Sequence, residues 1–340
     1  MDFFETLYEE IIGFLGIGNA WEILQGGDYS VLATYEGITA FILPIIPLLV
    51  LLEFVLGLVY KKPDTKVYKV NFLIYVFNRF VGRFIAIAMV VLIIGWLQPY
   101  APFQTSPTWY WFIYGYIVWE FGHFLYHYWG HKVRLFWCLH STHHAPENMN
   151  LSVTYAHFFL EAPYADTIRT TICILAGVEP AMLFAIMFID GTYGAFIHVG
   201  ENMIKDARFG ALGKFILTPS HHRVHHARNP LYMDTNFCNL LNIWDHVFGT
   251  YQEEKRDVKV EYGITRPMDS GNFIDVYFGE IIALAKDVWN APGLKNKLMY
   301  IFMPPGWSHT GDHRTAKTVR EDYFKKTSTV PSVDEQIISK

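Results

Sequence analysis

The chain has 340 residues, of which 52% are hydrophobic, 17% aromatic and only 17% charged, and its mean hydropathy is +0.18. Soluble domains carry about 25% charged residues, so this composition excludes a disordered chain and favours a membrane protein. The net charge of -5 comes without a basic stripe, which argues against nucleic acid as a partner. Three scattered cysteines cannot form a disulfide scaffold or a Cys-based zinc site.

Several apolar runs predict an all-α, multi-pass transmembrane helical bundle. Residues 1–35 have no signal-peptide pattern, because a positively charged start is missing, and FFETLYEEIIGFLGI is typical of an interfacial helix. Apolar runs long enough to cross a bilayer, about 20 residues, follow at 38–60, 80–97 and 109–129. Two shorter runs, 163–177 and 181–199, are separated at Pro180 and predict a helical hairpin that enters the membrane and returns.

The distribution of positive charge predicts the orientation of this bundle. The loop after the first run contains Lys61, Lys62, Lys66 and Lys69, whereas residues 98–108 carry no charge. Short loops rich in Lys and Arg remain cytoplasmic, so the N-terminus is expected outside. Three crossings then bring the end of the third run to the cytoplasm. At the C-terminal end of the given sequence, residues 325–336 are expected to fray.

Fifteen histidines are the compositional oddity, and twelve of them lie between His123 and His226. Eight form one H-x-x-x-H and two H-x-x-H-H groups: His127 and His131; His140, His143 and His144; His222, His225 and His226. Spacings of three and four residues lie on one face of a helix, so each group is expected to aim its imidazoles at one point. Adjacent histidines can also serve two different metals, and eight nitrogens suit two ions rather than one.

The spacing of the histidines does not choose the metal, since all-nitrogen sites suit zinc, copper, iron or nickel. A structural zinc site is closed with four ligands. At least eight nitrogens divide instead into two sites with a position left open, as oxygen activation requires. Clustered ionisable side chains at membrane depth are expensive and usually functional, which favours a metal centre over chance grouping.

These histidine groups and their surroundings resemble the fatty acid hydroxylase and sterol desaturase superfamily of membrane-bound di-iron oxygenases. The resemblance covers about residues 115–267 and rests on EFGHFLYHYWGHKVRLFWCLHSTHHAPENMNLS, FIHVGEN, TPSHHRVHHARNPLYMDTNF and IWDHVFGTYQEE followed by YGITRP. Within the superfamily, the chain resembles the alkylglycerol monooxygenases more than the other branches. It implies that the eight clustered histidines and His198 bind two iron ions. Ala156 and Phe158 stand where many members have Arg and His, which leaves the role of the neighbouring His157 open. The position of His123 is more often aromatic in relatives, so its role is open too.

Polar side chains near the histidines are expected to orient them, because a ligating imidazole usually donates its other N–H to a carboxylate or carbonyl. The candidates are Glu120, His221, Asp234, Asn236 and Asp245, with Glu147 as a further carboxylate near the second group. Helix capping and ordinary surface charge explain any one of them equally well. Asp190 lies in an apolar run and is expected to face protein or a water-filled cavity. No catalytic residue beyond the ligands is identified.

The resemblance implies hydroxylation of a membrane lipid by O2, with an electron donor that the sequence does not reveal. In the ether-lipid branch the reaction cleaves alkylglycerol ethers and the donor is tetrahydrobiopterin. A sterol or fatty acid hydroxylase or desaturase is the alternative within the superfamily. A membrane metal carrier or sensor is the non-enzymatic alternative, disfavoured because carriers need ligands across the membrane and these histidines gather on one side.

The charge distribution, the polar character of the chain after Val199 and the resemblance together predict a domain organisation and a location. Residues 1–250 are expected to form the transmembrane catalytic domain, and residues 251–340 a cytoplasmic C-terminal region. The active site is expected on the cytoplasmic side of the endoplasmic reticulum or of a bacterial inner membrane. The exact lipid, the choice between hydroxylation and desaturation and the oligomeric state do not follow from the sequence.

Overall fold

The computed structural model describes residues 18–27, 44–60, 65–81 and 83–328, with the single positions 5, 8, 12 and 40. Over these residues the protein is helical, with two isolated β-bridges and no strand, which confirms the all-α prediction. The expected interfacial helix within residues 1–35 lies largely outside the described residues. So do Lys61, Lys62 and most of the segment 325–336.

The chain divides into two compact units, residues 1–63 with 199–205, and residues 64–198 with 206–340. The first unit contains α2 (Gly18–Gly26) and α4 (Ile45–Tyr60). Glu53, the one charged residue of the run 38–60, is buried on α4 and accepts a hydrogen bond from the backbone N–H of Gly200 at 3.0 Å. This bond explains how a carboxylate is tolerated in an apolar helix.

Helices α4 and α6 are shorter than the apolar runs from which they were predicted. Helix α4 has 16 residues, and the run 80–97 is divided between α5 (Thr65–Val81) and the 15-residue α6 (Arg83–Leu97). Helix α7 (Trp109–Lys132) has 24 residues but carries Glu120 and several histidines. Among the described residues, no helix combines the length and the apolar character needed to cross a membrane.

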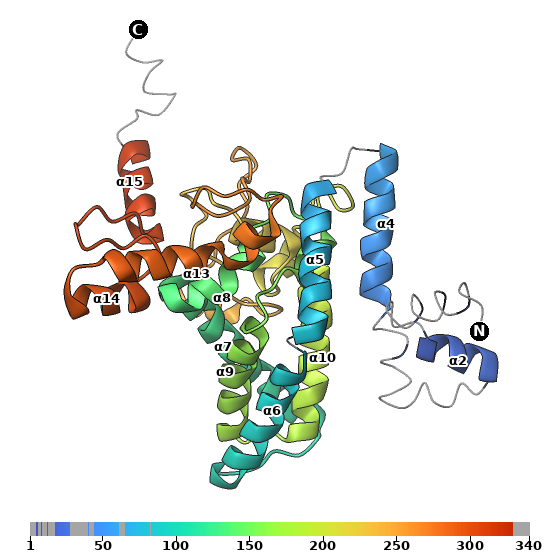
Figure 1. Cartoon of the computed structure of the whole chain (residues 1–340). Helices are drawn as coiled ribbons and strands as arrows, with labels where there is room; N and C mark the ends of the chain where they lie inside the picture. The colour runs from blue at the N-terminus through green and yellow to red at the C-terminus, as the bar shows by residue number, and fades with distance from the viewer. Residues whose placement is uncertain are drawn as a thin grey trace. The chain divides into compact units, whose positions relative to one another are not determined.

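The second unit is built around α7, which packs against α9 (Glu161–Leu175) and α10 (Pro180–Phe196), while α6 packs against α9 (Figure 1). A Cβ at Gly122 would lie 3.0 Å from the Cα of Arg169, so a glycine allows α7 and α9 to approach closely. The turn between α9 and α10 forms as predicted, with Pro180 at the start of α10 and the Glu179 side chain accepting from the N–H of Met182. An apolar cluster joins these helices through Trp119, Ile174 and Ile186.

Six further helices complete the described part of the second unit. They are α8 (Arg134–His144), α11 (Pro219–His225), α12 (Ile243–Phe248), α13 (Phe273–Asn290), α14 (Gly293–Phe302) and α15 (Ala316–Ser328), with 3-10 turns at Gln98–Tyr100, Leu151–Tyr155 and Gly210–Lys214. Helix α13 packs against α8 and α5, and α14 packs against α13 and α8. The division into a catalytic domain and a C-terminal region at residue 250 stays a prediction.

Candidate metal centre

The nine histidines proposed as ligands converge in two buried groups. The first contains His127, His131, His140, His144 and His225, and the second contains His143, His198, His222 and His226. Within each group one ring nitrogen from every member lies within 4.8 Å of the others. Helices α7, α8 and α11 and the segment after α10 supply them, so residues up to 99 positions apart in the chain meet at one place.

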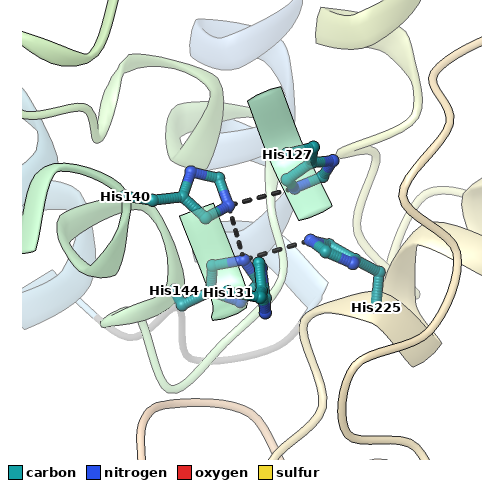
Figure 2. A group of neighbouring side chains, drawn as sticks. All are labelled: His127, His131, His140, His144 and His225. Atoms are coloured by element: carbon teal, nitrogen blue, oxygen red, sulfur yellow. Dashed lines mark hydrogen bonds between the residues drawn. The ribbon is translucent and has the colours of Figure 1, made fainter. Parts of the chain in front are cut away.

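In the first group the Nε2 atoms point toward one another, as Figure 2 shows. The Nε2 of His140 lies 3.0 Å from that of His127 and 3.0 Å from that of His144, which in turn is 3.1 Å from the Nε2 of His225. The Nε2 of His131 is buried without a hydrogen-bond partner. The group thus presents five ring nitrogens around one small space.

The second group repeats this arrangement with four residues. The Nε2 of His198 lies 3.1 Å from that of His143 and 2.9 Å from that of His222. The Nε2 of His226 lies 3.0 Å from that of His222. The two groups adjoin, because the rings of His144 and His226, one from each group, stack with centroids 4.4 Å apart.

Each H-x-x-H-H motif is divided between the two groups. On α8, His140 and His144 belong to the first group and His143 to the second; at α11, His225 belongs to the first and His222 and His226 to the second. The structure thus matches the possibility that adjacent histidines serve two sites, and the imidazoles of one H-x-x-H-H motif do not all aim at one point. Adjacent residues on a helix point about 100° apart, so a helix lying between two centres feeds both.

The outer nitrogens of several histidines are held by fixed acceptors. The Nδ1 of His127 donates to the carbonyl of Phe237 at 2.8 Å, that of His225 to the carbonyl of Thr235 at 2.8 Å, and that of His198 to the carbonyl of Gly194 at 2.6 Å. An Nδ1–H of this kind leaves the lone pair on Nε2. These bonds therefore aim the metal-binding atom of each ring inward, as the second coordination shell of a metal site does.

The residues fit a pair of metal ions. Burial, with the neighbouring imidazoles, lowers the pKa of His143, His144, His222, His225 and His226 well below the usual range, so these rings are neutral and able to coordinate. Lone pairs facing one another at about 3 Å are unfavourable without a cation between them. Two adjoining sets of five and four nitrogens suit two ions of a metal that binds imidazole, such as iron, zinc, copper or nickel.

Asp234 is the predicted carboxylate that lies beside a proposed ligand. Its Oδ1 lies 3.4 Å from the Nδ1 of His131, and its Oδ2 pairs with Lys132. Although burial alone would raise the pKa of Asp234, these partners lower it, so Asp234 remains an acceptor for His131. It adopts a positive φ of 58°, a conformation that Asp tolerates better than most residues.

Glu120 and Asp245 do not contact the histidines, which corrects their expected role. Glu120 accepts the backbone N–H groups of Asn239, Leu240 and Leu241. Asp245 accepts those of Phe237 and Cys238 at 2.8 and 2.9 Å, and the hydroxyl of Thr250 at 2.6 Å. Both carboxylates thus fix the segment 237–241, whose first carbonyl holds His127.

Asn236 and His221 also act on the backbone. The side-chain N–H2 of Asn236 donates to the carbonyls of His221 and Gln252, and its oxygen accepts the N–H of Gln252 at 2.8 Å. His221 forms a capping box with Thr218 at the start of α11, and its Nε2 lies 2.9 Å from the Tyr251 hydroxyl. His221 therefore lies outside both groups and fixes the beginning of the helix that carries the third motif.

Glu161 is the polar neighbour that the sequence analysis missed. Its two oxygens lie 2.6 Å from the Nδ1 of His140 and 2.8 Å from the Nδ1 of His157. The ring of His157 stacks on that of His143 with centroids 4.2 Å apart. The side chain of Asn78 on α5 donates to the backbone carbonyl of His157 at 2.6 Å. The spacing of four residues between His157 and Glu161 is the sequence feature that could have indicated this contact. Glu147, by contrast, bonds to Ser270 and lies near Arg228.

His123 and Asp190 form a separate buried polar contact. The Nδ1 of His123 lies 3.5 Å from Asp190, and Arg169 on α9 approaches the same carboxylate at 3.6 Å. The side chain of Asn239 donates to Asp190 at 2.6 Å. Asp190 thus faces protein, as predicted, and joins α10 to α7, α9 and the segment 237–241.

The second unit contains an apolar groove of about 590 Å³. Helices α6, α7, α8 and α9 line it through Ile85, Met89, Trp129, Val133, Phe136, Pro163, Tyr164, Thr167 and Ile168. Tyr164 donates to the carbonyl of Tyr126 at 2.9 Å, and the ring of Tyr126 stacks on that of His127 with centroids 5.6 Å apart. The groove wall is thus connected to a proposed ligand, His127, through Tyr164 and Tyr126.

The fold and the site define a class of helical protein whose histidine groups lie between helices and suit a two-metal centre. Residues 112–250, which contain all nine histidines, match the family model for fatty acid hydroxylases. These residues are therefore similar to those of fatty acid hydroxylases.

Curated relatives point in the same direction. The chain is 34% identical over 189 residues to an alkylglycerol monooxygenase from Xenopus tropicalis, covering 55% of this chain and 40% of that protein. It is 32% identical over 206 residues to the alkylglycerol monooxygenase of Homo sapiens, covering 61% and 44%. An ornithine lipid hydroxylase from Rhizobium tropici is 27% identical over 158 residues, covering 46% of each. The chain spans less than half the length of these relatives, and no solved structure matches it.

Proposed function

We propose that the protein is an O2-dependent lipid monooxygenase with two iron ions, and that it cleaves alkylglycerol ethers. The observation that carries the proposal is the pair of adjoining histidine groups, of five and four residues, inside the family-matched segment. The nine histidines are the proposed ligands, and iron is preferred because of the family. The names of the alkylglycerol monooxygenases support the ether-lipid substrate.

Iron bound to these groups supplies the activation of O2 and the oxidation of an unactivated C–H bond. In the overall reaction one oxygen atom enters the C–H bond and the other leaves as water, with two electrons and two protons from an external donor. Hydroxylation at the carbon next to the ether oxygen gives a hemiacetal. Its collapse releases a fatty aldehyde and a glycerol.

The chain's own residues position the ligands and exclude water. Glu161 and Asp234 hold His140 and His131 from outside, and backbone carbonyls hold His127, His198 and His225. The apolar groove suits the alkyl chain of a lipid, because its walls are carbon-rich and Tyr164 and Tyr126 connect it to His127. The reacting carbon would then lie at the inner end of a chain held by apolar contacts.

The proposed location is a membrane, with the metal centre on its cytoplasmic side. The apolar runs of the sequence support it, and so do large apolar side chains exposed on α6, among them Val91, Leu92 and Trp96, since exposed apolar patches of this kind mark interaction surfaces. A reduced pterin, tetrahydrobiopterin in the ether-lipid branch, is the proposed electron donor.

The similarity to an ornithine lipid hydroxylase favours a second candidate. In that case the same centre hydroxylates a fatty acyl lipid and leaves the chain intact, with a donor other than a pterin. A metal carrier or sensor would share the histidine groups but not the O2-dependent chemistry.

One assay separates these candidates. The reconstituted protein receives iron, a reduced pterin and a labelled alkylglycerol, and fatty aldehyde is measured under air and under argon. Aldehyde under air alone is the expected result. A hydroxylated acyl lipid or sterol with another donor, and no aldehyde, would reject ether cleavage but keep the oxygenase. Absence of any oxidised lipid at full iron occupancy would reject the oxygenase.

A further inference from the structure

Helix α14 has an inner face that is firmly packed. Tyr300 is buried in an apolar cluster with Cys138 of α8 and Leu284 of α13, and its hydroxyl bonds to His309 at 2.9 Å. At the end of the helix the carbonyl of Met303 accepts the N–H of Arg134 at 3.0 Å. The helix is therefore fixed in orientation against the beginning of α8.

The outer face of α14 is apolar and exposed. Leu294, Leu298 and Phe302 recur every four residues and form one stripe, with side chains 73%, 45% and 59% exposed. Trp289, at the end of α13 just before this helix, is 83% exposed. An apolar stripe with an aromatic residue at its edge is the pattern of a helix that lies in a membrane interface.

Lysines border this stripe. Lys295 and Lys297 fall on its two sides at helical spacing, and Lys286 lies one turn before Trp289. Asp287, the acidic residue of this region, is engaged by Arg134 at 2.6 Å, so the lysines leave a positive rim around an apolar face. Lysine stems can lie along apolar surface while their ammonium groups reach phosphate.

We propose that the outer face of α14, with Trp289, rests on the interface of a bilayer containing anionic phospholipid. The positive rim complements the phosphate groups, and the leucine and aromatic side chains enter the boundary between headgroups and acyl chains. Helices α13 and α14 run across the direction of α9 and α10 in Figure 1. An interfacial helix has this relationship to a bundle that enters the bilayer.

The contact would hold the lipid groove close to the bilayer surface. Arg134 bonds to the end of α14, and its near neighbours along the chain, Val133 and Phe136, line the apolar groove. The inference rests on the proposed membrane location, but not on lipid oxidation.

The test uses the full chain with a single bimane fluorophore attached to Leu294→Cys. The three native cysteines are buried, which directs labelling to the new one. The protein is reconstituted in phosphatidylcholine vesicles with and without phosphatidylglycerol. Spin-labelled phosphatidylcholine then quenches from the lipid side and iodide from the water side. Leu92→Cys on α6 reports membrane insertion, and Lys317→Cys on α15, whose side chain is exposed, reports free water.

The Leu294 probe should be quenched by the spin-labelled lipid and shielded from iodide, with the opposite result at Lys317. In the charge test, Lys295→Glu with Lys297→Glu should weaken lipid quenching by at least about twofold in anionic vesicles only, whereas Lys317→Glu should not. If iodide reached the probe at position 294 as well as the probe at Lys317, while the probe at Leu92 was quenched by lipid, the inference about α14 would be overturned but the membrane location would stand. Access at all three sites would overturn the membrane location too. Protection that persists in detergent and disappears on dilution would indicate a second copy of the chain instead.

Discussion

Glu161 on α9 accepts a hydrogen bond from the Nδ1 of His140 on α8 at 2.6 Å. Burial alone would raise the pKa of Glu161, but His157 and His140 lower it to about 2. Glu161 therefore stays ionised and acts as a constant acceptor. A carboxylate on the far nitrogen makes an imidazole a stronger ligand and fixes its ring.

Glu161→Gln should weaken metal binding in the first group, because the amide preserves the shape but removes the negative charge behind His140. Loss of an outer-shell partner typically costs about 10- to 100-fold in metal affinity. Competition with a chelator of known affinity measures the change. Glu147→Gln, which alters an exposed carboxylate, is the matched control. Equal affinities for both variants would contradict the role of Glu161.

His144→Ala and His226→Ala should each lower the metal content from two ions per chain. The first removes a nitrogen from the five-residue group and the second from the four-residue group. Activity should vanish in both, since a lost ligand changes geometry as well as affinity. Metal analysis of the purified proteins provides the measurement.

His309→Ala is the control for these variants, because His309 bonds to Tyr300 and belongs to neither group. It should keep two ions. Full activity of His226→Ala would refute its assignment as a ligand.

Asp245→Asn should destabilise the fold around the metal centre. The buried carboxylate accepts two backbone N–H groups and the Thr250 hydroxyl, and an amide cannot satisfy all three. Unsatisfied buried donors cost about 1–3 kcal/mol each. Thermal unfolding of the metal-loaded protein should show a lower midpoint, and Asp257→Asn, at an exposed position, should not. A normal midpoint for Asp245→Asn would contradict this role.

Eight of the nine histidines could be found from the sequence because their spacing is local. The pairs separated by four residues, His127 and His131, His140 and His144, and His222 and His226, each share a helix face and a group. His198 was recognised through the family resemblance. The partition into groups could not be found in this way, since it depends on how α8 and α11 lie between the two centres. Only the packed helices show which neighbour faces which group.

The polar neighbours of the histidines were harder to predict. Glu120 lies two turns before His127 on α7, but the Nδ1 of His127 bonds to the carbonyl of Phe237 instead. Glu120 accepts backbone N–H groups of the residues that follow Phe237, such as Leu240. Glu161 was missed because it reaches His140 only through the packing of α9 near α8. Helix existence was largely predictable from apolar pattern, whereas the lengths of α4 and α6 were not.

Ile168→Trp should narrow the apolar groove and reduce turnover of long alkyl chains more than of short ones. Ile168 lines the groove on α9, and adding an indole to that wall takes space from a bound chain. The ratio of kcat/KM for long- and short-chain alkylglycerols measures the effect. Ile189→Trp, at an exposed position on α10, should leave the ratio unchanged. An unchanged ratio for Ile168→Trp as well would exclude the groove as the chain site.

The division of each H-x-x-H-H motif between the two groups has a consequence for how the centre assembles and diverges. His143 and His144 are joined by a single peptide unit, and so are His225 and His226, yet the members of each pair serve different groups. A metal that orders one member of a pair also orders the backbone of the other, so filling one site prepares its neighbour. Partial loading would then be disfavoured, and two ions would be expected to enter and leave together. A substitution that moves the ligands of one site would therefore also move the ligands of the other, so the two sites are expected to diverge together.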